Sequence, residues 1–523
     1  MAGIRLSGLA SGIDTETMIK QLMQAERAPV DRLSQKKQTM TWQRDAYREM
    51  NRGLLDLRSA ASDMLLSKNY QSKTVTSSNP SALTVTASAG ALAGSVTIDS
   101  IDQLASAASM TLVAASGKKS DATLDESGLF KKDATGKINV QINTFDATGK
   151  AVTETLRFDA TQKISELTTA INSKTSLGMN AVFNDLTGKL VLTKTSTGNL
   201  SPGGADISVV DLSTNAIRVD STDKTYGREG KNAEYTIGGQ KLEQTTNTFT
   251  QNGLSITLNN VTTTATTINT TLDIQSNFDS IKKFVDKYND MVDKMNKKVR
   301  EEKYRDYQPL TDAQRKELSE DEVKKWEEKA MSGVLKNDSY LRDGMNDFRS
   351  TLSAKIDTGY TIPSASGPVT LSSLSQIGIT STSDFRDGGK IKLDEAKLKE
   401  MLEKHPDGVY RLFTADAPAK VKQNDGTEID NPNGLSGFIR QIQTFTTNLR
   451  DKISNVAGRD GAVATTYRLG KSLADIDKSM LSWEDKLKRK EDSYYRRFAA
   501  MEQAMNQANS QSATLTNYLT QGQ

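Results

Sequence analysis

The sequence predicts an α+β multidomain protein. Helices from both ends of the chain form a coiled-coil leg and a stalk, and an all-β, hairpin-rich head is inserted between them. Apolar residues recur every three or four positions near both termini, which is the spacing of one face of a helix. Between about 71 and 275 apolar and polar residues alternate in a region rich in Thr and Ser, which is typical of strands. Helical spacing returns from residue 276, so the β region lies inside a helical frame.

The N-terminal region is predicted to supply an extended arm and two helices. Residues 1–14 are apolar but rich in Gly and Ser, so we expect an arm. Asp14 is the predicted N-cap of a short helix that ends near Pro29, and a second helix is expected from Val30 to about Ser67. The apolar stripe of this second helix consists of Leu33, Met40, Tyr47, Met50, Leu54, Leu57, Ala61 and Met64.

Three similar segments punctuate the predicted head. DATGK occurs at 133–137 and again at 146–150, and DLTGK occurs at 185–189. Each is predicted to be a hairpin turn, because Gly adopts the left-handed backbone conformation that such turns require. A short helix is expected over 164–173 within this region.

The stalk is predicted to begin with a helix from Ser276. Its apolar residues follow steps of three and four, and they are Phe278, Ile281, Val285, Tyr288, Val292, Met295 and Val299. Ser319 and Glu322 form a predicted capping box farther along the chain. Another amphipathic helix is expected from Ser436 to Gly458.

The C-terminal stretch is predicted to be one long helix with a heptad seam, starting at Ser472 as its N-cap. The seam residues are Leu473, Ile476, Met480, Trp483, Leu487, Tyr494, Phe498, Met501, Met505, Ala508, Leu515 and Leu519. One phase slip, or stutter, occurs where Lys490, Tyr494 and Phe498 follow each other at steps of four. A helix roughly 70 Å long with one apolar edge needs a partner, and the N-terminal helices are the simplest one.

These patterns define four predicted domains. They are an N-terminal arm with leg and stalk helices at 1–70, a β head at 71–275, a helical stalk with short β elements at 276–470, and a C-terminal coiled-coil leg at 471–523. The head is expected to contain two subdomains, about 71–110 with 230–275 and about 111–229.

Candidate chemistry is sparse, and we expect no enzyme, no cofactor and no metal site. The single histidine, His405, cannot support a metal cluster or a catalytic triad, and there is no cysteine. The stretch 128–137 superficially resembles a phosphate loop, but its glycine spacing is wrong and Ile138 replaces the metal-binding hydroxyl. Carboxylates could form a glycosidase-like pair, yet they alternate with Lys and Arg as on a solvated helix face.

The overall charge argues against two classes of partner. There are 68 basic and 65 acidic residues, so no net field favours nucleic acid or a membrane surface. No run of eighteen apolar residues is present, and membrane insertion is therefore not expected. The first twenty residues do not have the organisation of a signal peptide, so any export is expected to occur without cleavage of one.

Several motifs resemble one protein family, the flagellar hook-associated protein 2 or filament cap family. The opening SGLASGIDTETMIKQLMQAERAPVDRL resembles the N-terminal signature of the family, and INSKTSLGMNAVFNDLTGKLVLTK resembles a β motif shared by flagellar axial proteins. Further similar stretches are 230–258, 278–296, 307–338, 371–413 and 495–515. The signature positions are Ser7, Gly8, Leu9, Ser11, Gly12, Ile13 and Asp14. About 110–165 and 195–229 carry no match.

The resemblance implies a non-enzymatic protein of the bacterial flagellum. Family members are exported unfolded by the flagellar type III system with an export chaperone, and they form a ring-shaped homo-oligomer, often fivefold. The ring sits at the distal tip of the filament, beyond the hook–filament junction proteins, where it retains exported flagellin and promotes its polymerisation. The predicted leg would then dock into the open filament end, the stalk would support it, and the head would form a plate.

Two other interpretations stay open. In the first, the chain is a tip adhesin whose β head binds host mucin or glycans and whose coiled coil is a stem. An adhesin and a cap are compatible, since a cap is exposed at the tip. In the second, the chain is a hook–filament junction protein or flagellin, against which the motifs at 307–338 and 371–413 argue.

Overall fold

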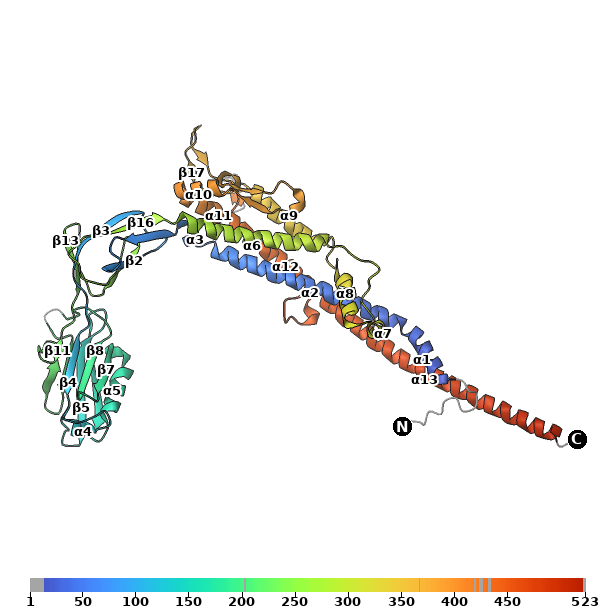
Figure 1. The fold of residues 1–523 in the computed structure, drawn as a ribbon, viewed down its shortest axis with the longest axis horizontal. Helices are drawn as coiled ribbons and strands as arrows, with labels where there is room; N and C mark the ends of the chain where they lie inside the picture. The colour runs from blue at the N-terminus through green and yellow to red at the C-terminus, as the bar shows by residue number, and fades with distance from the viewer. Residues whose placement is uncertain are drawn as a thin grey trace. The chain divides into compact units, whose positions relative to one another are not determined.

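The computed structural model describes residues 14–520 apart from 202–203, 366, 418–419, 423–426 and 431–433. The chain divides into two compact units, one formed by Met1–Tyr70 with Gln275–Gln523 and the other by Gln71–Ile274. The first unit is mainly helical and combines both ends of the chain, whereas the second is mainly β (Figure 1). The predicted fold class, α+β with helices from both termini and a β-rich insertion, is therefore confirmed.

The helical unit contains eleven α-helices among the described residues. They are α1 (Thr15–Glu26), α2 (Ala28–Asp63), α3 (Lys68–Gln71), α6 (Ile274–Arg300), α7 (Asp312–Glu317), α8 (Glu320–Met331), α9 (Ser339–Ser353), α10 (Glu395–Lys404), α11 (Pro406–Thr414), α12 (Phe438–Ala457) and α13 (Arg468–Thr520). Short 3-10 turns are η2 (Leu374–Ile377), η3 (Phe385–Asp387) and η4 (Ala464–Thr466). Three two-stranded ribbons pair β17 (Thr361–Ile362) with β18 (Val369–Thr370), β19 (Ile379–Ser381) with β20 (Ile391–Leu393), and β21 (Lys420–Lys422) with β22 (Glu428–Asp430).

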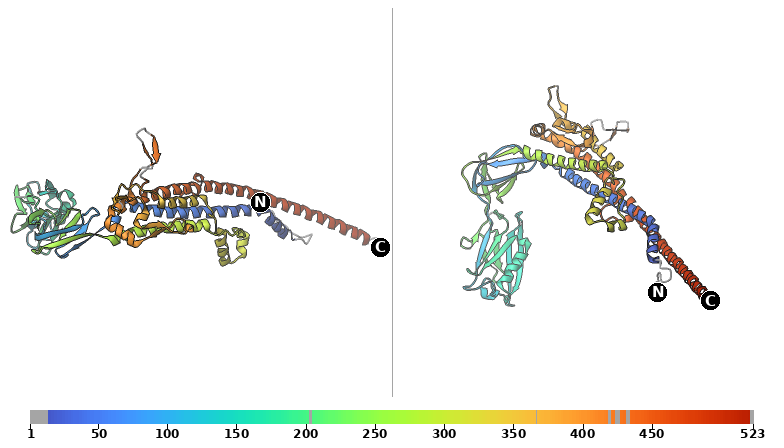
Figure 2. Two further views of the ribbon diagram at one scale, coloured as in Figure 1. Left: turned by 90° about the horizontal axis from the view of Figure 1, so that it is seen from above. Right: turned by 45° about the vertical axis from the view of Figure 1, so that its right-hand side comes forward.

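Helix α2 runs antiparallel to α12 along its C-terminal half. The Asn51 amide donates to Ser454 Oγ at 2.9 Å, and the Gln443 amide donates to Ser62 Oγ at 2.9 Å. The residue numbers on α12 fall as those on α2 rise, which sets the direction. Figure 2 shows the helices of the two chain ends side by side in this unit.

Helix α6 supplies the apolar centre of the helical unit. All six predicted stalk-core residues are buried, namely Phe278, Ile281, Val285, Tyr288, Val292 and Met295. The Tyr288 hydroxyl donates to the backbone oxygens of Phe348 and Gly389, at 3.2 and 3.0 Å. The Phe438 ring packs edge-to-face on Phe284 with centroids 6.1 Å apart. The hydroxyl of Tyr288 is thus buried with partners, as a buried polar group requires.

Four predicted helix starts are wrong by two to four residues, and that of α12 is the only late one, at Phe438 instead of Ser436. Helix α13 begins at Arg468, so Ser472 lies inside the helix. The reason is local: the backbone of η4 passes so close that a Cβ on Gly470 would lie 2.1 Å from the Ala464 oxygen. Gly470 therefore allows the chain before α13 to pack closely against the first turn of the helix, and the helix continues through this glycine. Helix α6 begins at Ile274, before the predicted cap Ser276.

The other early start concerns α2. Helix α2 begins at Ala28, two residues before the predicted Val30, because Pro29 stands in its first turn, where a missing N–H costs nothing. Two predicted caps are present as expected. Asp14 accepts from the Thr17 N–H at 2.9 Å, and Ser319 and Glu322 form the capping box of α8.

We expect Gly344→Val to destabilise the helical unit by roughly 1–3 kcal/mol, because it overpacks a three-helix contact. A Cβ at Gly344 of α9 would lie 2.5 Å from a methyl of Leu449 and 3.2 Å from the methyl of Met295. Urea unfolding followed by circular dichroism measures the loss. Asp343→Val, at an exposed position of the same helix, is the control and should change the unfolding free energy by less than about 0.5 kcal/mol. Equal effects of the two substitutions would contradict the close packing.

The β unit contains two groups of sheets. The first group has a five-stranded sheet of order β1 (Lys73–Ser77), β16 (Thr266–Leu272), β3 (Gly94–Gln103), β12 (Ala233–Ile237) and β13 (Gln240–Gln244). Beside it is a three-stranded sheet of order β14 (Thr248–Gln251), β15 (Leu254–Leu258) and β2 (Leu83–Ala87). Their shared apolar core includes Ile98 and the stacked rings of Tyr235 and Phe249, 4.5 Å apart.

The second group encloses a separate apolar core. One of its four-stranded sheets has the order β10 (Ala216–Asp220), β9 (Ile207–Asp211), β5 (Lys137–Phe145) and β6 (Ala151–Asp159). The other has the order β11 (Gly227–Arg228), β4 (Ser109–Val113), β8 (Lys189–Lys194) and β7 (Met179–Asn184). The helices α4 (Leu124–Ser127), α5 (Ile164–Ser173) and η1 (Thr175–Leu177) belong to this group. Ile138, Leu190 and Ile207 are among its buried core residues. The strand pairs of the β unit are antiparallel throughout the described residues, as expected for hairpins.

Two of the three predicted hairpin turns join paired strands. DATGK at 146–150 connects β5 to β6, and DLTGK at 185–189 connects β7 to β8. The first DATGK, at 133–137, is not a hairpin. It is a turn that leads into β5, closed by the Asp133 carboxylate, which accepts from the Lys137 N–H at 3.0 Å. Gly136 has the predicted positive φ, so the turn chemistry is the same although no second strand precedes it.

Candidate assembly surface

The first part of the predicted C-terminal seam packs against α2. Leu473, Ile476 and Leu487 are buried, and Met480 and Trp483 are half-buried. A surface ion pair marks the contact, with Lys37 Nζ of α2 2.6 Å from the Asp477 carboxylate of α13. Exposed pairs of this kind contribute little energy, so the buried apolar residues hold the two helices together.

The predicted α2 stripe is shared between two partners. Leu33 and Met40 are half-buried in the part that runs along α13, whereas Leu54 and Leu57 are buried in the part that runs along α12. The prediction that the whole stripe meets the C-terminal helix is therefore wrong for its second half. Heptad spacing shows that a helix has a partner face but does not show which helix fills it.

Tyr47 is buried at the point where α2 passes the start of α9. Its hydroxyl donates a short hydrogen bond to Asp338 Oδ2, while Asp338 Oδ1 accepts from the Leu341 N–H at 3.0 Å and caps α9. Burial, with the Asp338 contact as the second cause, raises the pKa of Tyr47 well above its usual value. One carboxylate thus fixes two helices, a contact that sequence spacing gave no means of finding.

The stutter in α13 lies where α1 docks. Lys490 Nζ contacts the Glu26 carboxylate, and the Tyr494 hydroxyl donates to Glu26 Oε1 at 3.1 Å. Ile19, which precedes Glu26 by about two turns of α1, is buried. The step of four places Lys490 and Tyr494 on one side of α13, so both reach the same carboxylate. The phase slip therefore coincides with a change of partner along the rod, from α2 to α1.

We expect the docking of α1 to weaken in acid. The hydrogen bond from Lys490, followed by that from Tyr494, lowers the pKa of Glu26 below its ordinary value of 4.5. The contribution of Glu26 is therefore complete above pH 4.5 and is lost as the pH falls through the lowered value. The anisotropy of a dye attached at Gln24→Cys should drop in that range. Glu26→Gln should abolish the pH transition, because it removes the titrating carboxylate, and Glu16→Gln should keep it; a transition retained in Glu26→Gln would refute the contact.

Beyond the docking site of α1, the seam of α13 is open to solvent. Phe498 and Met505 are half-buried, the Met501 side chain is 37% exposed, and that of Leu515 is 62% exposed. Leu519 lies in the helix, but its side chain is outside the described residues. Figure 1 shows α13 extending past the ends of α1 and α2 within the helical unit. An apolar edge on a single helix is stable only when something covers it.

Helix α1 adds a second exposed apolar strip. Met18 is 42% exposed and Leu22 is 39% exposed, and the two lie four positions apart on one face of α1. The predicted family-signature residues Ser7, Gly8, Leu9, Ser11, Gly12 and Ile13 lie outside the described residues. Together, Met18 and Leu22 of α1 with Met501, Met505 and Leu515 of α13 form what we call the terminal apolar surface.

No catalytic constellation was found in the described part of the chain. His405 joins α10 to α11, and its ring lies 6.2 Å from that of Tyr360. No group of three or more potential metal ligands occurs among the described residues. Likewise, no described helix has the length and apolar character needed to cross a bilayer.

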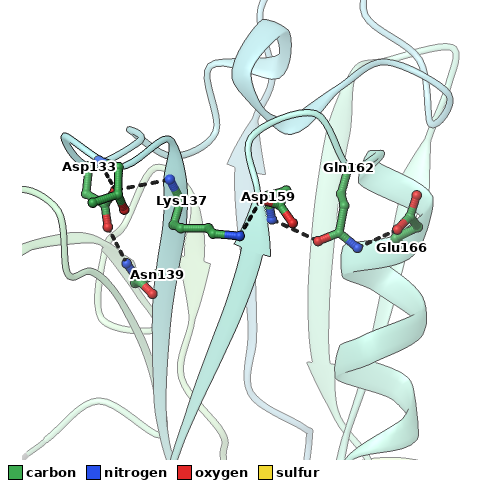
Figure 3. Close-up of polar contacts among 7 residues, drawn as sticks. Asp133, Lys137, Asn139, Asp159, Gln162 and Glu166 are labelled. Carbon is green, nitrogen blue, oxygen red and sulfur yellow. Dashed lines mark hydrogen bonds and ion pairs between the residues drawn. The ribbon is translucent and has the colours of Figure 1, made fainter.

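One open cleft of about 630 Å³ lies on the β unit, beside the start of β5. Figure 3 shows that its polar side chains bind one another. Lys137 Nζ contacts Asp159 at 2.5 Å, the Asp159 N–H donates to Gln162 Oε1 at 2.9 Å, and the Gln162 amide donates to Glu166 at 2.6 Å. Asp159 is paired with Lys137, and Asp159 and Glu166 are both exposed, so these two carboxylates are not the desolvated acid that general acid catalysis requires.

Taken together, the fold and this surface define a structural protein whose exposed apolar strips lie on its terminal helices. The chain matches the C-terminal domain family of flagellar hook-associated protein 2 over residues 230–510 and the N-terminal domain family over residues 11–108. It is 32% identical over 545 residues to flagellar hook-associated protein 2 of Halalkalibacterium halodurans, covering 98% of this chain and 99% of that protein. The chain belongs to the flagellar hook-associated protein 2 family, the structural proteins of the flagellar filament cap.

Two further likenesses differ in extent. A flagellar hook-associated protein 2 of Thermotoga maritima is 26% identical over 208 residues, or 38% of this chain and 28% of that protein. The crystal structure of the D1-D2-D3 domains of the flagellar cap protein FliD from Escherichia coli superposes with a TM-score of 0.55. It is 20% identical and covers 83% of this chain and 99% of that structure, and it supports the fold alone.

Proposed function

We propose that this chain caps the distal end of the bacterial flagellar filament, where it retains exported flagellin and promotes its polymerisation. The terminal apolar surface carries the proposal. It lies on the outermost parts of α1 and α13, and in the described chain nothing covers it. Family membership supplies the location, and the surface supplies a means of attachment.

The terminal apolar surface is suited to a reversible attachment. Burying a large apolar side chain contributes roughly 1.5–3 kcal/mol, so a few such residues can bind a partner and still allow it to dissociate. A cap must move outward as subunits insert beneath it, which requires contacts that form and break repeatedly. The terminal helices, and not the buried core of α6, are therefore the proposed filament-contacting leg.

The remaining parts of the proposal follow from the family. We propose a ring-shaped homo-oligomer, fivefold in the simplest case. At the tip its partners are flagellin and the end of the filament, and before export its partner is an export chaperone. Passage through the flagellar type III system, without removal of a signal peptide, would bring the chain to the extracellular tip. A ring uses two different faces of each copy, because its contacts are heterologous.

Negative-stain electron microscopy of the purified full-length chain tests this function. We expect ring-shaped plates with protruding legs. Isolated rods, or long filaments built from this chain alone, would overturn the proposal, because neither could close the end of a filament. Purified flagellin filaments added to the same sample should carry one plate at a single end.

A further inference from the structure

A basic groove lies between α2, α3 and α6 in the helical unit. We define it by Met64, Leu66, Lys283, Phe284 and Lys287, which line a cavity of about 370 Å³. Met64 and Phe284 are buried and form an apolar floor, while Leu66 on the rim is 49% exposed. Lysine ammonium groups and an apolar floor together fit a segment that carries one large apolar side chain beside carboxylates.

Two of the three lysines that line the basic groove, Lys283 and Lys287, have no partner in the described chain. On the same helix, Lys282 contacts Asp286 at 2.7 Å and Lys297 contacts Asp293 at 3.0 Å. Lys283 and Lys287 are exposed, make no hydrogen bond or ion pair with any described residue, and repel each other at a spacing of one turn. Unpaired like charges beside an apolar floor therefore favour an acidic partner.

The lining also contains Lys68 and one carboxylate, Asp63. The groove thus has an excess of positive charge even before a partner arrives. A neutral apolar helix would bury these ammonium groups without compensation, which is costly. A partner that brings carboxylates would compensate this charge.

A matching segment lies on the outer side of α13. Leu481 is 63% exposed, and Glu484 and Asp485, one turn farther, are exposed and make no ion pair within the described residues. Residues three and four apart on a helix share a face, so the apolar side chain and the two carboxylates point the same way. We call these three residues the acidic stripe.

The acidic stripe cannot reach the basic groove of its own chain. The stripe follows Asp477, which is paired with Lys37 on α2, whereas the groove begins at Ala60 on the same helix. The 23 residues between Lys37 and Ala60 correspond to about 35 Å along α2. Only a second copy can bring the stripe to the groove.

We propose that the acidic stripe of one copy docks in the basic groove of its neighbour, with Leu481 on the apolar floor and Glu484 and Asp485 against Lys283 and Lys287. The inference rests on the proposed function, since a cap is what places copies side by side. The contact is heterologous, as a ring requires. All copies of a closed ring stand at the same height along its axis, so the acidic stripe and the basic groove of one copy must also stand at the same height. Because the two sites are about 35 Å apart along α2, the helical units must be strongly inclined to the ring axis.

Cysteine cross-linking tests the contact directly, because the chain has no cysteine of its own. A chain carrying Lys283→Cys and Glu484→Cys should form a ladder of disulfide-linked oligomers on oxidation. A disulfide needs Cα atoms within about 7 Å, which excludes the link within one copy. Lys294→Cys with Glu484→Cys is the matched control, since Lys294 is exposed on α6 but does not line the groove. This control should give no ladder.

Charge reversal provides the second readout. Lys283→Glu with Lys287→Glu should weaken self-association at least about tenfold in sedimentation velocity, and so should Glu484→Lys with Asp485→Lys. All four substitutions in one chain should restore self-association to within about threefold of the unmodified chain. Restoration requires that the two sets of charges face each other.

The outcomes separate this contact from the proposed function. Absence of the ladder, or equal ladders from the test pair and its control, overturns the proposal. If rings still form in electron micrographs while the ladder is absent, the copies meet elsewhere and the cap function stands. If neither rings nor the ladder form, both the contact and the cap function are overturned.

Discussion

Val292→Asp is expected to unfold the helical unit. The Val292 side chain is buried on α6, and a Cβ added at Gly388 would lie 3.5 Å from one of its methyl groups. An aspartate there would be a charged group with no partner, which costs several kcal/mol. A loss above about 4 kcal/mol is a large part of the stability of a domain. Circular dichroism at 222 nm during heating should show the helical transition at a much lower temperature or not at all.

Lys294→Asp is the matched control for this substitution. Lys294 is exposed on the same helix two residues later, so the same side chain enters at a position open to water. Its melting temperature should stay within about 2 °C of that of the unmodified chain. Unchanged melting of Val292→Asp would show that α6 is not the core of the unit.

Met501→Asp is expected to abolish capping and leave the fold unchanged. The Met501 side chain is 37% exposed on α13, beyond the contact of Glu26 with Lys490, so the substitution removes no intrachain packing of consequence. On the filament, the new carboxylate would replace an apolar contact with a desolvated charge. Cells that depend on this variant should release flagellin into the medium and should not spread in soft agar.

Gln503→Asp tests whether charge alone explains that effect. Gln503 is exposed on the same turn of α13 but lies off the seam, so it should support normal swimming. Both variants should melt at the temperature of the unmodified chain. Normal filaments from Met501→Asp would remove this end of α13 from the docking element.

The helical frame could be predicted because its signals are local. Steps of three and four from Phe278 to Met295 mark a face that is buried in the structure, and the caps at Asp14 and Ser319 follow from short-range hydrogen bonds. The same holds for the turns at 146–150 and 185–189, where Gly takes a positive φ.

Partner choice could not be predicted, because it depends on contacts between distant residues. The division of α2 between α12 and α13 leaves no trace in its heptad spacing, and Tyr47 and Asp338 are 291 positions apart. The order of the five-stranded sheet is equally non-local, since β16 pairs with both β1 and β3. The stutter at Lys490 and Tyr494 was a signal of the candidate surface, although its partner Glu26 became evident only in the structure.

The basic groove illustrates a different limit. Lys283 and Lys287 look like ordinary solvated lysines on a helix that has many charges. Their distinction is that they are unpaired and also line a cavity with an apolar floor, and both facts need the positions of distant residues.

The end of α13 has no partner among the described residues, and we expect it to acquire one on assembly. Hydrogen–deuterium exchange of peptides covering residues 501–517 tests this most directly, in the purified chain and in caps bound to filaments. We predict rapid exchange in the purified chain and strong protection on the filament, with the α6 peptides protected in both. Equal protection of residues 501–517 in the two samples would contradict the claim.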